Sequence, residues 1–150
     1  MKIYRIAREQ YIEDLTGEGA RLYGGRWNKK GDPMVYFSRY LSLCALEILV
    51  HLETRLIPED YYYMEAEIKE EQYTTIAHPE KIIKGWNATT VTAATQQYGS
   101  DWLDSASSLG LQIPSVILPQ ETNLLINPKH PKMSNLKIIR TAPLLFDSRL

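Results

Sequence analysis

The sequence predicts a single mixed α+β domain, residues 1–150. The chain has 150 residues, 44% of them hydrophobic, and a domain of this size buries roughly 70% of the surface that its unfolded chain exposes. Short segments rich in β-branched and aromatic residues are interspersed with two longer segments of helical spacing. They do not alternate in the regular order of a doubly wound parallel sheet. No linker, repeat or low-complexity tract divides the chain.

The first half of the chain contains two predicted strands and one predicted helix. Segments Lys2–Ile6 and Met34–Ser38 are short, rich in Ile, Val and aromatic residues, and bounded by turn residues, so both are expected to be strands. A glycine-rich loop lies between them. Segment Leu41–Thr54 is apolar nearly all round, which predicts a helix buried on most sides with Ser42 as its cap.

The second half contains a half-exposed strand, a long helix and two shorter strands. Segment Tyr61–Ile68 alternates between an apolar face and a second face with Glu65, which is typical of a strand with one side in solvent. Segment Thr90–Ser108 has apolar residues at helical spacing, with a possible break at Gly99–Ser100. The remaining segments are assigned as strands at Gln112–Leu118 and Leu136–Thr141 and as a loop at Asn123–Pro131.

Charge and hydropathy disfavour two classes of partner. The formal net charge is -1, so the chain lacks the excess of Lys and Arg by which proteins coat nucleic acid, and no direct nucleic-acid partner is expected. Segment Met1–Ile6 lacks the pattern of a signal peptide, and Leu41–Leu52 is too short and too polar to cross a membrane. The single Cys44 has apolar neighbours and is expected to be a buried thiol. These features predict a cytoplasmic protein without a membrane partner.

The loop Gly17–Asn28 is a candidate binding site. It holds four of the eight glycines within nine residues, together with Arg21 and Arg26. Glycine allows close backbone approach to a ligand, and guanidinium groups bind phosphate or carboxylate through paired hydrogen bonds. Trp27 beside Arg26 favours a site that holds a flat ring near a phosphate. The Walker sequence and the full dinucleotide fingerprint are absent, and an ordinary turn-rich connection is the alternative.

Glu47 is the second candidate, because it lies in the middle of the apolar helix. An unpaired carboxylate in an apolar interior costs several kcal/mol, so Glu47 must face a cleft, meet a cation or stay protonated. His51 lies four residues later on the same helical face and is a candidate partner. A side chain that simply reaches solvent at the helix edge is the alternative.

Ser115 and Tyr36 are weaker candidates on pattern alone. Ser115 lies in an apolar strand without the Gly-x-Ser-x-Gly turn of hydrolases. Tyr36 follows the glycine loop on a strand and can line the same cleft as Arg26. The three histidines are scattered and the single cysteine has no partner, so no metal site is expected.

Several ordered motifs make the chain similar to the RES domain family, the toxins of RES-Xre toxin–antitoxin systems, named for an arginine, a glutamate and a serine. The resemblance covers nearly the whole chain and is weakest at Glu70–Thr95. It rests on Tyr4–Ile6, Gly17–Arg21, Gly24–Asn28, Val35–Ser38, Ala45–Leu52, Ile113–Ser115, Asn123–Pro128, His130–Pro131 and Phe146–Leu150.

The resemblance implies an ADP-ribosyltransferase-like fold, with a mixed central sheet flanked by helices and a cleft for NAD+ as the substrate. No separate cofactor is expected. The arginine of the family name corresponds to Arg26, the glutamate to Glu47 and the serine to Ser115, and these three are the expected catalytic residues. The expected NAD-binding side chains are Tyr36, Arg26, Arg5, Arg21 and Trp27.

A toxin of this family is expected to cleave the nicotinamide N-glycosidic bond of NAD+, with water, phosphate or a protein side chain as acceptor, and so to deplete NAD+ and arrest growth. The resemblance also implies an Xre-type helix-turn-helix antitoxin as partner, with a homodimer inside that complex as a further expectation. Two alternatives stay open. One is an RNA-cleaving toxin that uses Arg26, His51 and Glu47, which the near-neutral charge disfavours. The other is a non-catalytic module that binds a nucleotide.

Overall fold

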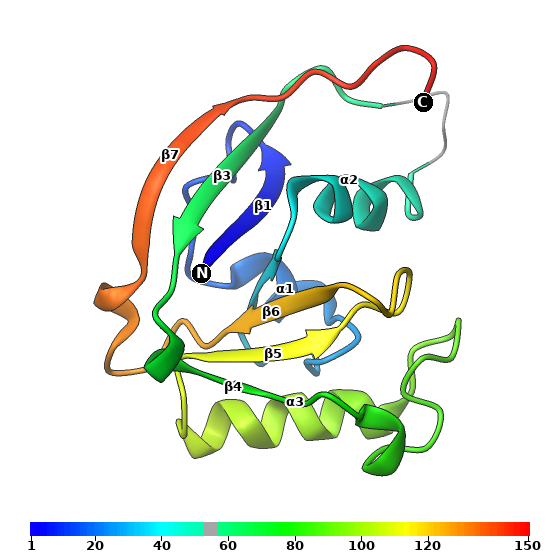
Figure 1. Cartoon of the computed structure of the whole chain (residues 1–150), viewed down its shortest axis with the longest axis vertical. Helices are drawn as coiled ribbons and strands as arrows, with labels where there is room; N and C mark the ends of the chain where they lie inside the picture. Colours follow the sequence, from blue (N-terminus) through cyan, green and yellow to red (C-terminus); the bar gives the residue numbers. More distant parts are fainter. Residues whose placement is uncertain (53–56) are drawn as a thin grey trace.

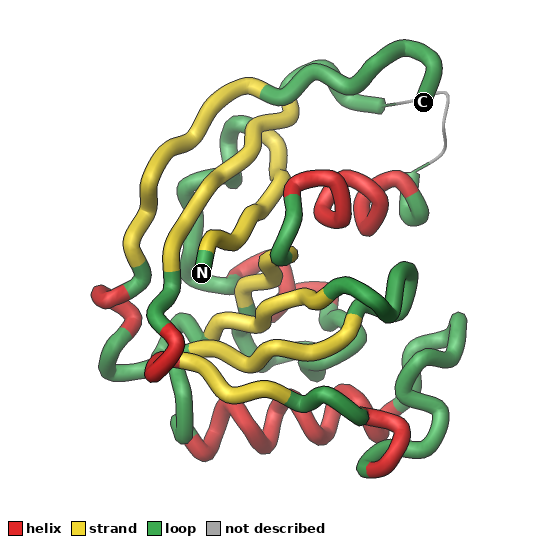
Figure 2. Tube along the Cα trace, in the orientation of Figure 1, coloured by secondary structure: helices red, strands yellow, loops and turns green. Residues whose placement is uncertain are grey.

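The computed structural model, which describes residues 1–52 and 57–150, is an α+β fold with one seven-stranded sheet (Figures 1 and 2). The helices are α1 (Glu18–Tyr23), α2 (Leu41–Leu49) and α3 (Ala93–Ser105), with short 3-10 turns η1 (Glu70–Gln72), η2 (Pro79–Lys81) and η3 (Met133–Asn135). The strands are β1 (Lys2–Arg8), β2 (Val35–Ser38), β3 (Tyr61–Glu67), β4 (Tyr73–Thr75), β5 (Gly110–Pro114), β6 (Thr122–Ile126) and β7 (Lys137–Pro143).

The sheet has two halves that meet between β1 and β2. The strand order is β4-β5-β6-β2-β1-β3-β7, and every neighbouring pair is antiparallel except β4 and β5. Strands β1 and β2 are joined through a single residue pair, Tyr4 and Ser38. In Figure 1 strands β1, β3 and β7 run steeply to the direction of β4, β5 and β6. The junction therefore brings helix α2, which packs on β1 and β2, toward the ends of β5 and β6.

Apolar side chains cover both faces of the sheet, as the alternation along single strands shows. Phe37 of β2 and Leu124 of β6 belong to a core cluster on one face, whereas Leu125 points to the opposite face and packs with Trp27 and Trp102 of α3. A third cluster on that second face lies between α2 and strands β1 and β3. Helices α2 and α3 therefore cover separate parts of the same face (Figure 2).

Helix α2 is shorter and more exposed than its sequence predicts. It ends at Leu49, residues 50–52 form a turn, and the expected end at Thr54 lies outside the described residues. Leu46 and Val50 are 40% and 61% exposed, so the expectation of a helix buried on most sides is wrong. Ser42 does not cap the helix, because the capping position is Tyr40. The helix packs on the sheet with one face, and some of its apolar side chains are exposed to solvent on the other.

Other sequence assignments also differ from the structure. Segment 122–126 is strand β6, between β5 and β2, and a loop begins only at Asn127. The run Leu124–Ile126 is fully buried, so the asparagines at its ends misled the assignment. Helix α1 lies inside the predicted glycine loop, and β4 was not predicted. The predicted strand at Gln112–Leu118 is confirmed in part, since β5 spans Gly110–Pro114.

Strand β3 is covered on both faces, contrary to its alternating sequence. Glu65 is 3% exposed and forms ion pairs with Lys2 of β1 at 2.7 Å and with Arg140 of β7 at 3.1 Å. The hydrogen bond from Lys2 and its charge, helped by Arg140, lower the pKa of Glu65 against the opposing effect of burial. The carboxylate therefore links three neighbouring strands.

Helix α3 runs through Gly99 without the predicted break. Gly99 is instead the residue at which the helix contacts the glycine-rich loop. A Cβ atom at Gly99 would meet the carbonyl oxygen of Trp27 and lie 2.7 Å from its carbonyl carbon. Backbone atoms cannot move aside as the end of a flexible side chain does. Glycine is required here for close packing, and this packing positions the segment that carries Arg26.

We predict that Gly99→Ala destabilises the protein by about 1–3 kcal/mol, since the added methyl group overpacks the contact with Trp27. In an open helix the same change stabilises by roughly 0.5–1 kcal/mol. Gly19 of α1 has nothing within 4 Å of its Cβ position, so Gly19→Ala is the matched control. Urea unfolding of both variants measures the difference, and equal midpoints would contradict the assigned contact.

We predict that Glu65→Gln lowers the stability at neutral pH, and that the deficit shrinks in acid. A carboxyl whose folded pKa is depressed stabilises above its unfolded pKa, near 4.5, and this stabilisation is lost as pH falls through the folded value. Thermal unfolding of wild type and variant from pH 7 down to pH 3 measures the effect. A deficit that is constant across this range would contradict the ion-pair assignment.

Candidate active site

The Glu47 carboxylate is held at the junction between the two halves of the sheet. Its Oε1 accepts a hydrogen bond from Ser115 Oγ at 2.8 Å and another from Asn123 Nδ2 at 2.7 Å. Within residues 1–52 and 57–150, Oε2 has no hydrogen-bond partner. Charge-assisted hydrogen bonds stabilise an ionised acceptor. They explain how a carboxylate is accommodated in an apolar helix and leave one oxygen available.

Ser115 directly follows β5 and is fully buried. Its Oγ accepts hydrogen bonds from the backbone N–H groups of Ile117 at 3.0 Å and Leu118 at 3.2 Å. With both of these donors on the oxygen, the hydroxyl proton is directed to Glu47. The turn after β5 thus presents Ser115 as a donor in one orientation.

Asn123 of β6 was not among the predicted site residues, yet it contacts Glu47 as closely as Ser115 does. Its Oδ1 accepts a hydrogen bond from Ser38 Oγ at 2.8 Å, and the two residues are paired across β2 and β6. Ser38 is 4% exposed. Both residues lie in motifs of the RES resemblance, which is the signal that could have identified them. The assignment of Asn123 to a loop concealed the pairing.

Arg26 lies partly buried near Glu47, on the loop after α1. Its Nη1 donates to the carbonyl oxygens of Trp86 at 3.1 Å and Ala88 at 2.8 Å, which attaches this loop to the segment before α3. Burial lowers the pKa of the Arg26 guanidinium, and the charges of Glu47 and Tyr36 raise it. Arginine stays protonated under such shifts, so the site holds a fixed cation near the Glu47 carboxylate.

Tyr36 holds the loop that carries Arg26. Its hydroxyl donates to Asn28 Oδ1 at 2.7 Å and accepts from the backbone N–H of Trp27 at 3.1 Å. Asn28 is fully buried, and its Nδ2 donates to the carbonyl oxygens of Ala20 in α1 and of Lys29 and Asp32 in the loop. A Cβ at Gly25 would lie 2.6 Å from the Tyr36 hydroxyl, so glycine permits this approach. Burial raises the pKa of Tyr36, which therefore remains a neutral donor.

The structure brings together Arg26, Tyr36, Glu47 and Ser115 but leaves the other predicted residues apart. The Trp27 ring is 3% exposed and packs edge-on against Tyr98, so it belongs to the core and does not form a wall of the site, since a large apolar ring is more stable when buried.

The two supporting arginines have other partners. Arg21 forms an ion pair with Glu18 on the outside of α1. Arg5 donates through Nη1 to the carbonyl oxygens of Ile12 and Asp14 in the loop after β1. His51, the suggested partner of Glu47, is exposed and forms no hydrogen bond with it in the described chain. Glu47 is paired through residues distant in sequence instead.

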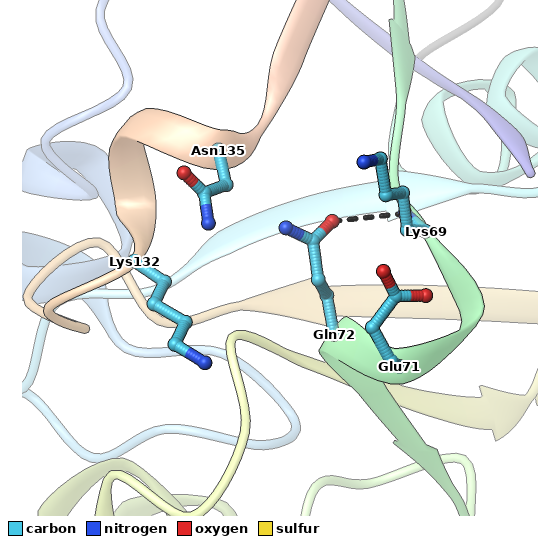
Figure 3. Close-up of a pocket in the computed structure, with 5 residues that line it drawn as sticks. All are labelled: Lys69, Glu71, Gln72, Lys132 and Asn135. Carbon is cyan, nitrogen blue, oxygen red and sulfur yellow. Dashed lines mark hydrogen bonds between the residues drawn. The ribbon is translucent and has the colours of Figure 1, made fainter.

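A separate hollow of about 310 Å³ lies between η1 and η3, lined by Lys69, Glu71, Gln72, Lys132 and Asn135 (Figure 3). None of these residues belongs to the Glu47 cluster. Among the described residues no group of three His, Cys, Asp or Glu side chains is placed to hold a metal ion. No helix in that part of the chain has the length and hydropathy to cross a membrane.

Comparisons with known proteins place the chain in a family. A sequence profile of the RES domain matches residues 2–147. "Toxin Res" of Yersinia enterocolitica is 37% identical over 152 residues, covering 100% of this chain and 99% of the relative. "Prs ADP-ribosylating toxin" of Sphingobium sp. is 38% identical over 151 residues, covering 99% and 94%.

A solved structure shares the fold. A chain of the MbcT–MbcA toxin–antitoxin complex of M. tuberculosis superposes with a TM-score of 0.76 at 17% identity, covering 95% of this chain and 83% of that chain. This likeness supports the expected α+β architecture with a mixed central sheet. With a family profile along nearly its whole length and toxins as full-length relatives, the chain belongs to the RES domain family of toxins.

Proposed function

We propose that this toxin of a toxin–antitoxin system cleaves NAD+ between the nicotinamide ring and its ribose. The observation that carries the proposal is the Glu47 carboxylate, with Oε1 bonded to Ser115 and Asn123, with Oε2 free of hydrogen bonds in the described chain, and with the Arg26 cation near enough to interact with its charge. The name of the Sphingobium relative, an ADP-ribosylating toxin, supports the same chemistry, since transfer of ADP-ribose from NAD+ breaks this bond.

The reaction breaks one glycosidic bond and forms one bond to an acceptor. The electron pair of the C1′–N1 bond leaves with N1, so the cationic ring departs as neutral nicotinamide. The ribose C1′ passes through an oxocarbenium-like state and then bonds to an oxygen or nitrogen atom of the acceptor. With water as acceptor, the products are nicotinamide, ADP-ribose and one proton.

The side chains have complementary roles in this proposal. Oε2 of Glu47 faces the ribose, where it accepts a hydroxyl hydrogen bond and stabilises the positive charge that develops at C1′. Arg26 binds the diphosphate, whose charges suit a guanidinium. Ser115, which is buried and directs its hydroxyl proton to Oε1, holds the carboxylate in place. Tyr36 supports the loop that carries Arg26 and packs beside a ring of the substrate.

We further propose an Xre-type helix-turn-helix antitoxin as the partner that keeps the toxin inactive. The M. tuberculosis structure, which holds a toxin together with its antitoxin, supports a partner of this kind. The chain's formal net charge of -1 gives it little affinity for DNA on its own. DNA recognition therefore falls to the antitoxin.

We predict that the purified toxin, freed of antitoxin, consumes NAD+ and releases nicotinamide, and that Glu47→Gln lowers kcat/KM by a factor on the order of 10²–10³. Glutamine keeps the volume and an oxygen acceptor for Ser115 but removes the charge that stabilises the oxocarbenium-like ribose. The matched control is Glu13→Gln, an exposed glutamate in a turn after β1. Chromatography of nicotinamide measures turnover, and circular dichroism checks the fold.

Other outcomes of this experiment would contradict the proposal. If wild-type toxin leaves NAD+ intact but still arrests growth, and cellular RNA is degraded, the RNA-cleaving alternative is correct. If NAD+ binds equally to wild type and Glu47→Gln without turnover by either, the chain is a binding module. Incubation with NAD+ plus inorganic phosphate identifies the acceptor, since ADP-ribose, its phosphate ester and labelled protein are distinct products.

A further inference from the structure

Glu47 uses one carboxylate oxygen for both of its hydrogen bonds. Ser115 Oγ and Asn123 Nδ2 both donate to Oε1, at 2.8 Å and 2.7 Å. Two donors from different segments, the turn after β5 and strand β6, leave the carboxylate little freedom to rotate about its last torsion, which is otherwise broad. The direction of Oε2 is then a consequence of where these two donors lie.

Asn123 can serve this role only if its amide faces Glu47 with nitrogen. The Glu47 carboxylate requires this orientation, because it can only accept, and Ser38 Oγ satisfies the other side of the amide by donating to Asn123 Oδ1 at 2.8 Å. A flipped amide would turn Oδ1 toward Oε1 and bring two acceptors together without a proton between them. The pairing of Ser38 with Asn123 across β2 and β6 sets this distance through the sheet itself.

We propose that Asn123, held by a hydrogen bond from Ser38, is a positioning residue that aims Oε2 of Glu47 at the substrate ribose. This inference rests on the proposed function and adds a Ser38–Asn123–Glu47 chain of hydrogen bonds to it. Other charged or titratable groups near Glu47 are Arg26 from the glycine-rich loop and Cys44 on α2 itself. Neither donates a hydrogen bond to Oε1 in the described chain.

We predict that Asn123→Ala lowers kcat by a factor on the order of 10 and leaves KM within about twofold, because the carboxylate is misdirected while the diphosphate site is unchanged. Asn123→Asp has the same shape and can still accept from Ser38, but it places a second carboxylate beside Glu47. Its kcat is expected to be at least as low as that of Asn123→Ala. As the pH is lowered, its activity is expected to fall at a higher pH than the activity of wild type does, because two adjacent carboxylates ionise less readily than one.

A second measurement tests the hydrogen bond without any substrate. The Asn123 side-chain amide signals in a ¹⁵N–¹H spectrum are expected to shift in Glu47→Gln and in Ser38→Ala, and to stay in place in Glu13→Gln. Asn135→Asp, an exposed asparagine on η3, is the charge-matched control for the kinetic series. Circular dichroism and urea unfolding verify that each variant folds.

The two measurements separate the failure of this inference from the failure of the proposed function. If the Asn123 amide signals do not respond to Glu47→Gln, the chain of hydrogen bonds is absent and the inference is wrong, whatever the activity. If they respond but Asn123→Ala and Asn123→Asp retain wild-type kcat and pH profile, the positioning role is wrong. Absence of NAD+ turnover by wild type overturns the proposed function, and a positioning role in that reaction falls with it.

Discussion

The hydrogen bonds from Ser115 and Asn123 to Glu47 join the two halves of this fold. Helix α2 packs on β1 and β2, whereas Ser115 and Asn123 belong to the β5–β6 hairpin on the other side of the junction. Strands β1 and β2 share one residue pair, so the sheet alone fixes their relative position weakly. A carboxylate at this place is costly without donors and favourable with two. The contact that accommodates the charge therefore also positions α2.

The loop that carries Arg26 is also fixed by contacts outside the site. Three contacts fix it from different directions: Tyr36 from the sheet, the Trp86–Ala88 segment through the guanidinium, and helix α3 through Gly99. A loop held in this way loses little conformational entropy when a ligand binds, since it is already ordered. The rigidity of the Arg26 loop and the fixed direction of the Glu47 carboxylate are both consequences of packing outside the site.

The sequence alone predicted the α+β class and most strands, and it singled out Arg26, Tyr36, Glu47 and Ser115, which the fold brings into one region, because periodicity and family motifs are local signals. It failed where tertiary pairing decides. Asn123 lies near the start of a buried central strand, yet asparagine in a segment that ends with prolines indicates a loop. Trp27 was expected at a ligand, but its ring packs edge-on against Tyr98, which lies far along the chain on α3. Such contacts have no signature in a single sequence.

The protonation states in the cluster limit how an acceptor is activated. Burial raises the pKa of Tyr36, so its hydroxyl keeps its proton and donates it to Asn28. Ser115 directs its proton to Glu47, and the Arg26 guanidinium is a permanent cation. Among these four groups the Glu47 carboxylate is the one that can accept a proton. In the NAD+ cleavage proposed above, a water or hydroxyl acceptor would therefore need Oε2 for activation as well as for stabilising the ribose. Phosphate would arrive already ionised and leave Oε2 free for the ribose throughout.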